Sequence, residues 1–169
     1  MPKLADIKMF TNAHYGIDVP LDYLLDHINK WIKEYNLQLD PDFQRAHVWT
    51  EEQQVKFIEY FLRGGVSGRD FYLNCPGWMH SFKEEMVLVD GKQRLNAITR
   101  LLHNEIPAFG HKLQEYTDGF RLSRHTVKLH VADLKTRAEV LQWYIDLNSG
   151  IAHTSEEIEK VKKMLEAEK

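Results

Sequence analysis

Hydrophobic residues recur every three or four positions in five stretches of the chain, the spacing of an amphipathic helix. Three of these stretches begin with a threonine that has Gln or Glu three residues later, which is the pattern of a capping box. Another begins with Pro20, a residue that is favoured in the first turn of a helix. We therefore predict helices over residues 20–32, 50–62, 91–104, 136–148 and 154–168.

Three shorter stretches have the residues of strands. Residues 70–75 and 85–90 are apolar runs on either side of a loop with Pro and Gly, and residues 126–131 alternate between apolar and polar positions. We also expect a hairpin within residues 106–123. Helices combined with a few strands predict an α+β fold, in which helices pack around a small mixed sheet. The length fits a single domain over residues 1–169.

The composition, with 43% hydrophobic and 28% charged residues, is that of a globular protein and argues against disorder. No apolar stretch approaches the roughly 20 residues that cross a bilayer, and residues 1–20 lack the apolar region of a signal peptide. Cys75 is the one cysteine, so neither an internal disulfide nor a zinc site built from cysteines is expected. We expect a cytoplasmic protein with no membrane partner.

Positive charge is concentrated in the middle of the chain. The whole chain has a net charge of −3, whereas residues 91–135 hold eight Lys or Arg and four acidic residues, for a net charge of +4. A locally basic segment suits an anionic ligand, either a nucleotide or a nucleic acid backbone. A solvated face of mixed charge explains the same composition equally well.

Three long polar side chains, Lys92, Gln93 and Arg94, follow the predicted strand that ends at Asp90-Gly91. A glycine that leads from a strand into a helix makes an anion site, because the helix end carries unpaired N–H groups and partial positive charge. The alternative is structural: Asp90 would cap the helix, and Gln93 would complete a capping box. That alternative leaves Lys92 and Arg94 unexplained, because positive charge in a first turn opposes the helix dipole.

A second polar pair, Gln44-Arg45, falls in the loop that we predict between Pro41 and Thr50. Loops held by a rigid scaffold often carry binding residues, so this pair is a second candidate for ligand contact. The structural alternative is an exposed arginine beside a packed Trp49.

Three segments together resemble a known family. The segment "PDFQRAHVW" (41–49) resembles its P-x-[FY]-Q-R-x-x-V-W motif, and "LVDGKQRLNAI" (88–98) resembles its D-G-Q-Q-R-L-x-x-[IL] motif. The segment "YIDLNSGIAHTSEE" (144–157) resembles a third, F-x-x-[LI]-N-x-G-x-x-x-[ST]-x-x-E. All three occur in order over residues 41–157. The family is that of the N-terminal domain of GmrSD-type modification-dependent restriction systems, within the ParB/sulfiredoxin-like superfamily.

The resemblance implies a ParB-like α+β domain that binds a nucleoside triphosphate and, in several members, hydrolyses it with a divalent metal such as Mg²⁺. Arg45 and Arg94 would hold phosphates. Asp90 would hold the metal or a water and Gln93 would orient the attacking water, so these two are the catalytic candidates. Asn148 would contact base or ribose, or would only cap a helix end. The positions implied to bind the nucleotide are Gln44, Arg45, Gly91, Lys92, Arg94 and Asn148.

Two departures from the family pattern bear on activity. Lys92 stands where the motif has its first Gln, which keeps a charge for phosphate but removes a residue that could position water. Family members couple this domain to an HNH-type nuclease, whereas residues 1–169 contain no complete HNH unit, so we expect no nuclease activity from them. The alternative function is a non-catalytic module that binds DNA or a restriction-system protein, such as a phage-encoded regulator or inhibitor of full-length relatives.

Overall fold

The computed structural model describes residues 15–78, 85–117, 122–149 and 155–168. In this part of the chain four strands form one sheet with the order β1-β4-β2-β3. β1 pairs with β4, and β2 with β3, in antiparallel fashion, whereas β2 and β4 run parallel. The sheet is therefore mixed, and the predicted α+β class is confirmed. The strands are β1 (Tyr15–Pro20), β2 (Asp70–Asn74), β3 (Val87–Asp90) and β4 (Thr126–Ala132).

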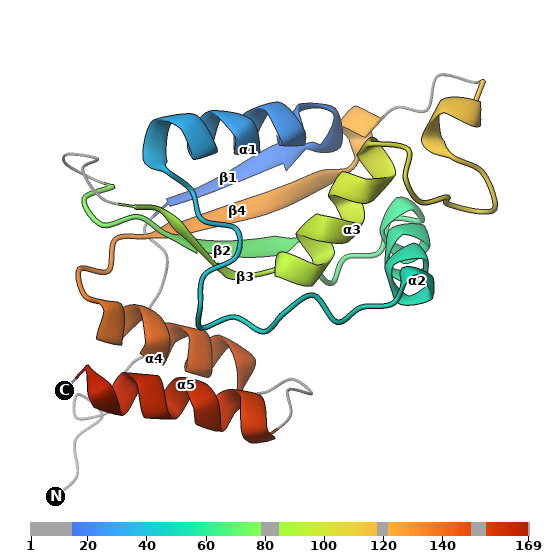
Figure 1. The fold of residues 1–169 in the computed structure, drawn as a ribbon. Coiled ribbons are helices and arrows are strands. Elements are labelled where there is room, and N and C mark those ends of the chain that lie inside the picture. The colour runs from blue at the N-terminus through green and yellow to red at the C-terminus, as the bar shows by residue number, and fades with distance from the viewer. Residues whose placement is uncertain (1–14, 79–84, 118–121, 150–154, 169) are drawn as a thin grey trace, which may run out of the picture.

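Helices cover both faces of this sheet (Figure 1). Residues of α1, α2 and α3 form one hydrophobic cluster with Phe71 of β2, and residues of α4 and α5 form a second cluster with Val89 and Ala132. Tyr72, the neighbour of Phe71 in β2, packs against the second cluster, because successive side chains of a strand point to opposite faces. The helices are α1 (Leu21–Tyr35), α2 (Glu51–Leu62), α3 (Lys92–Leu102), α4 (Arg137–Asn148) and α5 (Ser155–Ala167).

Two of the predicted capping boxes are confirmed. The hydroxyls of Thr50 and Thr136 accept from the backbone N–H three residues on, and the side chains of Gln53 and Glu139 accept in return. The third predicted box begins at Thr154, which lies outside the described residues. In the ranges that the structure describes, none of the helices has the length and apolar character needed to cross a membrane.

β1 is a strand that the hydrophobic pattern does not indicate. Tyr15 and Gly16 are exposed, Val19 is buried, and Pro20 is both the last residue of the strand and the residue at the N-cap position of α1. An edge strand tolerates exposed positions and a proline because only one of its sides joins a ladder. Pairing with β4, in which Ile17 lies opposite Leu129, is what holds this segment extended.

Residues 106–117 and 122–123, the described part of the predicted hairpin, form no strand ladder. Among the described residues of this segment there is one isolated bridge, Ala108–His111, followed by single 3₁₀ turns at Leu113–Glu115 and Leu122–Arg124. The Tyr116 hydroxyl donates to the Ala108 carbonyl oxygen at 2.6 Å. Residues 108–116 thus fold back on themselves as a compact loop.

The turn from β3 into α3 depends on Gly91. This residue is the N-cap of α3 and has a φ of 112°, a conformation that residues with a Cβ rarely adopt. The alternative in which Asp90 and Gln93 form a capping box is wrong, because Asp90 is the last residue of β3 and no side chain caps this helix. The sharp turn at Gly91 places the Asp90 carboxylate beside Arg94 instead.

Gly91→Ala should destabilise the protein through two separate effects. The backbone conformation costs about 1–2 kcal/mol for a residue with a Cβ, and the added methyl group would overlap the Phe71 ring, at a further cost of about 1–3 kcal/mol. The matched control is Gly64→Ala, because Gly64 has a φ of 87° but open space around its Cα. Equal losses in the free energy of unfolding for the two variants, measured by urea denaturation, would contradict the packing role of Gly91.

Candidate functional site

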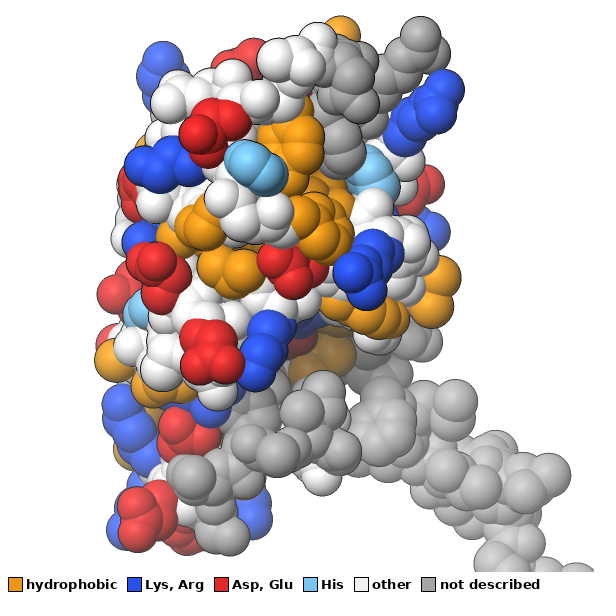
Figure 2. All heavy atoms as spheres, turned by 90° about the vertical axis from the view of Figure 1, so that its right-hand side faces the viewer, with side chains coloured by type: hydrophobic (Ala, Val, Ile, Leu, Met, Phe, Trp, Pro, Cys, Tyr) orange, Lys and Arg blue, Asp and Glu red, His pale blue; other side chains and the backbone are white. Residues whose placement is uncertain are grey.

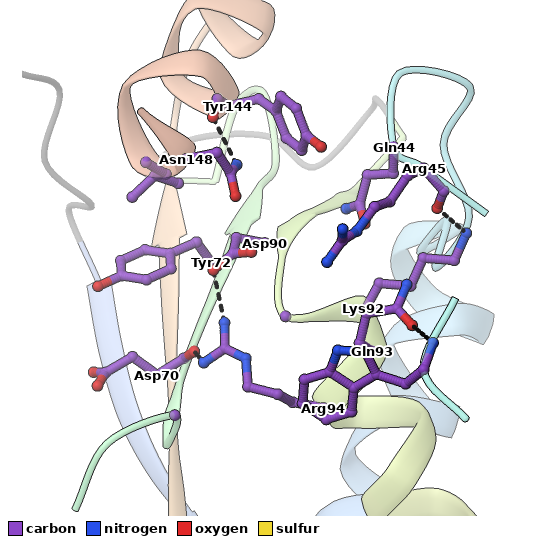
Figure 3. A pocket seen from close by; sticks show the side chains of 14 residues that line it. Gln44, Arg45, Asp70, Tyr72, Asp90, Lys92, Gln93, Arg94, Tyr144 and Asn148 are labelled. Carbon is purple, nitrogen blue, oxygen red and sulfur yellow. Dashed lines mark hydrogen bonds and ion pairs between the residues drawn. The ribbon is translucent and has the colours of Figure 1, made fainter. Parts of the chain in front are cut away.

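The eight site residues singled out in the sequence line one cavity of about 460 Å³ (Figure 3). Residues 90–94 come from the β3–α3 turn, Asn148 comes from the end of α4, and Gln44 and Arg45 come from the loop between α1 and α2. The backbone of Gln38 pairs with Met86 and Leu88 at 2.8 and 2.9 Å, and this draws the α1–α2 loop alongside β3. Segments about 45 positions apart in the sequence therefore meet at one place.

Arg94 is held inside the protein by three contacts. Its Nη2 donates to Asp90 Oδ2 at 2.7 Å, and its Nη1 donates to the backbone carbonyl oxygen of Asp70 at 2.9 Å. The guanidinium group lies over the Phe71 ring, 5.3 Å from its centre. Arg94 therefore connects the start of α3 to the start of β2 and to the end of β3.

Lys92 is held in a similar way. Its side chain is 14% exposed and forms an ion pair with Asp40. Its Nζ also donates to the backbone carbonyl oxygen of Arg45 at 3.0 Å. Lys92 thus connects the first turn of α3 to two points of the α1–α2 loop.

Gln93 is buried and fixes the same loop through its amide. Its Oε1 accepts from the backbone N–H groups of Val48 and Trp49 at 3.1 and 3.2 Å, and its Nε2 donates to the Ala46 carbonyl oxygen at 3.1 Å. An amide side chain offers both donor and acceptor, so it can replace a backbone partner for a loop that has none. The three polar side chains after Gly91 therefore hold the α1–α2 loop and the strands against the start of α3, and these contacts form the cavity.

Of Arg45, Lys92 and Arg94, the cations that line the cavity, Arg45 has the longest ion pair and the most exposed side chain. Its Nη1 lies 3.5 Å from a carboxylate oxygen of Glu157 in α5, and its side chain is 27% exposed. Figure 3 shows its guanidinium group directed toward the middle of the cavity. The neighbouring Gln44 donates from Nε2 to the Leu88 carbonyl oxygen, which fixes the backbone that carries Arg45.

The N-terminus of α3 opens on this cavity. Gly91, Lys92 and Gln93 all line it, and no side chain caps the helix. The first N–H groups of a helix have no partner within it and carry about half a positive charge in total. Together with Arg45, this helix end makes one wall of the cavity an attractive place for an anion.

Sequence reasoning missed several residues that line the cavity, among them Asp70, Tyr72 and Tyr144. Asp70 Oδ1 lies 2.6 Å from Nε2 of His130, and the Tyr72 ring stacks on the His130 ring at 4.8 Å between centres. Burial raises the pKa of Tyr72, and the carboxylates of Asp70 and Asp90 raise it further. Burial also raises the pKa of Tyr144, so both phenols are neutral at physiological pH.

Side chains alternate between the two faces of a strand, and this alternation along β2 could have indicated Tyr72 as a cavity residue. Tyr72 lies opposite Asp90 in the β2–β3 ladder. Tyr144 lies one helical turn before Asn148, and residues four apart share a helix face. Within the described ranges, no three His, Cys, Asp or Glu side chains are grouped so that they could hold a metal ion.

The fold and the cavity define a class: a mixed α+β domain whose polar site is assembled from a loop, a helix start and a helix end. The family model described as the N-terminal domain of the GmrSD restriction endonuclease matches residues 28–168, and this chain belongs to that family. No curated protein and no solved structure matches the chain. The match begins within α1, so β1 lies outside the matched residues.

Gln93→Leu should release the loop that carries Arg45. The substitution removes three hydrogen bonds, each worth about 1 kcal/mol, so the free energy of unfolding should fall by about 3 kcal/mol. The amides of Val48 and Trp49 should also exchange with solvent faster. Gln114→Leu, at an exposed glutamine, is the control and should change stability by less than about 0.5 kcal/mol. Unchanged exchange at Val48 and Trp49 in Gln93→Leu would disprove the bracing role.

Proposed function

We propose that the cavity binds a nucleoside triphosphate, with the phosphates against the start of α3 and Arg45. The observation that carries the proposal is the meeting of an uncapped helix N-terminus and a loosely held arginine in one cavity. Helix N-termini of this kind bind phosphate groups through their backbone N–H groups. A guanidinium group can add two parallel hydrogen bonds to a phosphate. Membership of a restriction-related family is the context for this activity.

The size of the cavity supports the proposal. Pockets for small ligands have volumes of roughly 300–1,000 Å³, and this cavity has about 460 Å³. Arg45 needs no rearrangement of the core to engage a ligand, since its ion pair with Glu157 is long and partly exposed. Arg94 and Lys92 already have acceptors in the protein, so they would add positive potential more than direct contacts.

Asp90 is the residue that fits a Mg²⁺ ion. Mg²⁺ in nucleotide sites is held by one or two carboxylates together with the phosphates and water, and Asp90 lines the cavity. The carboxylate of Asp70, by contrast, bonds to His130. The ion would supply positive charge that neutralises the phosphates. Arg94 already donates to Asp90 Oδ2, so Arg94 and the ion would both bind this carboxylate.

Binding has more support than hydrolysis. The catalytic role predicted for Gln93 requires its amide to orient a water molecule, but the Gln93 oxygen already accepts from two backbone N–H groups. Its nitrogen donates to a third backbone group of the same loop. Gln93 therefore supports the site as a brace, and the catalytic roles of Asp90 and Gln93 stay predictions.

We keep nucleotide ahead of DNA as the ligand because part of the positive charge of residues 91–135 is already paired within the protein. Lys92, Arg94, Arg100 and Lys135 each pair with a carboxylate. On the face in Figure 2, the Lys and Arg side chains of the described residues are interspersed with Asp and Glu. A solvated face of mixed charge accounts for the pairs of Arg100 and Lys135, whereas Lys92 and Arg94 are mostly buried.

The test is to measure the affinity of the protein for each of the four ribonucleoside triphosphates by calorimetry, with and without Mg²⁺. Arg45→Ala should weaken binding about ten- to hundredfold, because hydrogen bonds to charged groups contribute roughly 1.5–3 kcal/mol. The control is Arg137→Ala, which removes an arginine that pairs with Asp42 and Glu168 outside the cavity, and it should leave affinity unchanged. No binding at millimolar nucleotide, or equal binding by Arg45→Ala, would refute the proposal.

A further inference from the structure

Tyr144 adds a hydroxyl group to the cavity at a position where the family motif has none. The motif that residues 144–157 resemble begins with Phe, whereas this chain has Tyr at that position. Tyr144 belongs to α4, lines the cavity, and is 3% exposed. A buried tyrosine supplies a large apolar ring together with one polar group, which can bind a ligand. The ring belongs to the motif, but the hydroxyl is a feature of this chain.

The ring of Tyr144 is held beside the segment that carries Arg45. The buried Phe43 ring meets the Tyr144 ring edge-on, with 5.4 Å between the ring centres. Phe43 lies two residues before Arg45 in the α1–α2 loop. Figure 3 shows the Tyr144 hydroxyl directed toward the side of the cavity where Gln44 and Arg45 lie. The hydroxyl and the guanidinium group therefore face the same part of the cavity.

The charges around the Tyr144 hydroxyl agree with this placement. Burial is the main cause of the raised pKa of Tyr144. The carboxylates of Asp90 and Glu157 also raise this pKa, whereas the Arg45 guanidinium group lowers it. The hydroxyl thus lies close enough to feel all three charges, and it keeps its proton at physiological pH. A protonated phenol can donate a hydrogen bond to an anion.

Tyr72 provides a matched comparison, because it lines the same cavity and burial also raises its pKa. The Tyr72 ring stacks on the His130 ring, with 4.8 Å between the ring centres. Figure 3 shows the Tyr72 hydroxyl directed away from Arg45. Of these two phenols, that of Tyr144 is therefore the one placed to act together with Arg45.

We propose that the Tyr144 hydroxyl donates a hydrogen bond to the phosphate group that Arg45 holds. This inference rests on the proposed function, because it assumes that Arg45 binds a phosphate of the triphosphate. One phosphate group would then be bound from two elements, by a guanidinium group of the α1–α2 loop and by a phenol of α4. Since the phenol is uncharged, its contribution depends on the position of the phosphate and not on long-range attraction.

The test measures the affinity of the full chain for ATP and for inorganic triphosphate by calorimetry, in the wild-type protein and in Tyr144→Phe. The substitution keeps the ring and removes the hydroxyl. The affinity for both probes should fall by the same factor, roughly ten- to hundredfold, which is the effect of one hydrogen bond to a charged group. Tyr72→Phe is the matched control and should leave both affinities unchanged.

A second measurement keeps the hydroxyl in place. 3-Fluorotyrosine can be inserted at position 144 alone, and its fluorine signal followed while inorganic triphosphate is added. The signal should shift and saturate at the affinity that calorimetry gives. The control is the same label at position 23, an exposed tyrosine outside the cavity, whose signal should not move.

The outcomes separate this inference from the proposed function. Equal binding of both probes by the wild-type protein and Tyr144→Phe overturns the role of Tyr144 while triphosphate binding stands, and so does a fluorine signal at position 144 that does not shift. A loss for ATP alone overturns it as well, because the hydroxyl would then contact the nucleoside. If neither probe binds to the wild-type protein, the proposed function fails and this inference fails with it.

Discussion

The buried amide of Gln93 holds three backbone groups of the α1–α2 loop against the first turn of α3, and the cavity depends on this contact. The loop carries Gln44 and Arg45, and backbone bonds of Gln38 and the amide of Gln44 fix the same loop to β3. Lys92 adds a second link to the same loop through the Arg45 carbonyl oxygen. Lys92 and Gln93 both belong to the first turn of α3. The geometry of the site therefore follows from the sharp turn that Gly91 permits.

This arrangement explains why two cations occupy a helix turn where positive charge is unfavourable. Arg94 is compensated by the Asp90 carboxylate and the Asp70 carbonyl oxygen, and Lys92 is compensated by Asp40. The helix end itself has no side-chain cap. In our account, an anion supplies the missing acceptor for the N–H groups of α3, while the cations that flank it stay fixed. The site is thus organised before a ligand arrives, which lowers the entropic cost of binding.

Much of the fold could be predicted from local patterns, since capping boxes and 3.6-residue periodicity depend on neighbours in the sequence. The starts of α2 and α4 at Thr50 and Thr136 are examples. The roles of the polar residues could not be predicted in the same way. Asp90 and Gln93 have the spacing of a local capping box, but the partners of Gln93 lie 44–47 positions away in the sequence. The sequence did not indicate β1, because its conformation depends on a ladder with β4. Among residues 106–117, a side-chain hydrogen bond from Tyr116 to Ala108 joins two parts of a loop where we expected a hairpin.

The central claim is that the start of α3 receives an anion, and backbone amide chemical shifts test it most directly. Inorganic triphosphate can be titrated into ¹⁵N-labelled protein while the signals of Gly91, Lys92 and Gln93 are followed. The account predicts that these amides shift together, with saturation at one affinity, and that Gly64 and other turn amides away from the cavity do not. Saturating shifts confined to residues outside the cavity, or no shift at Gly91, Lys92 and Gln93, would contradict the account.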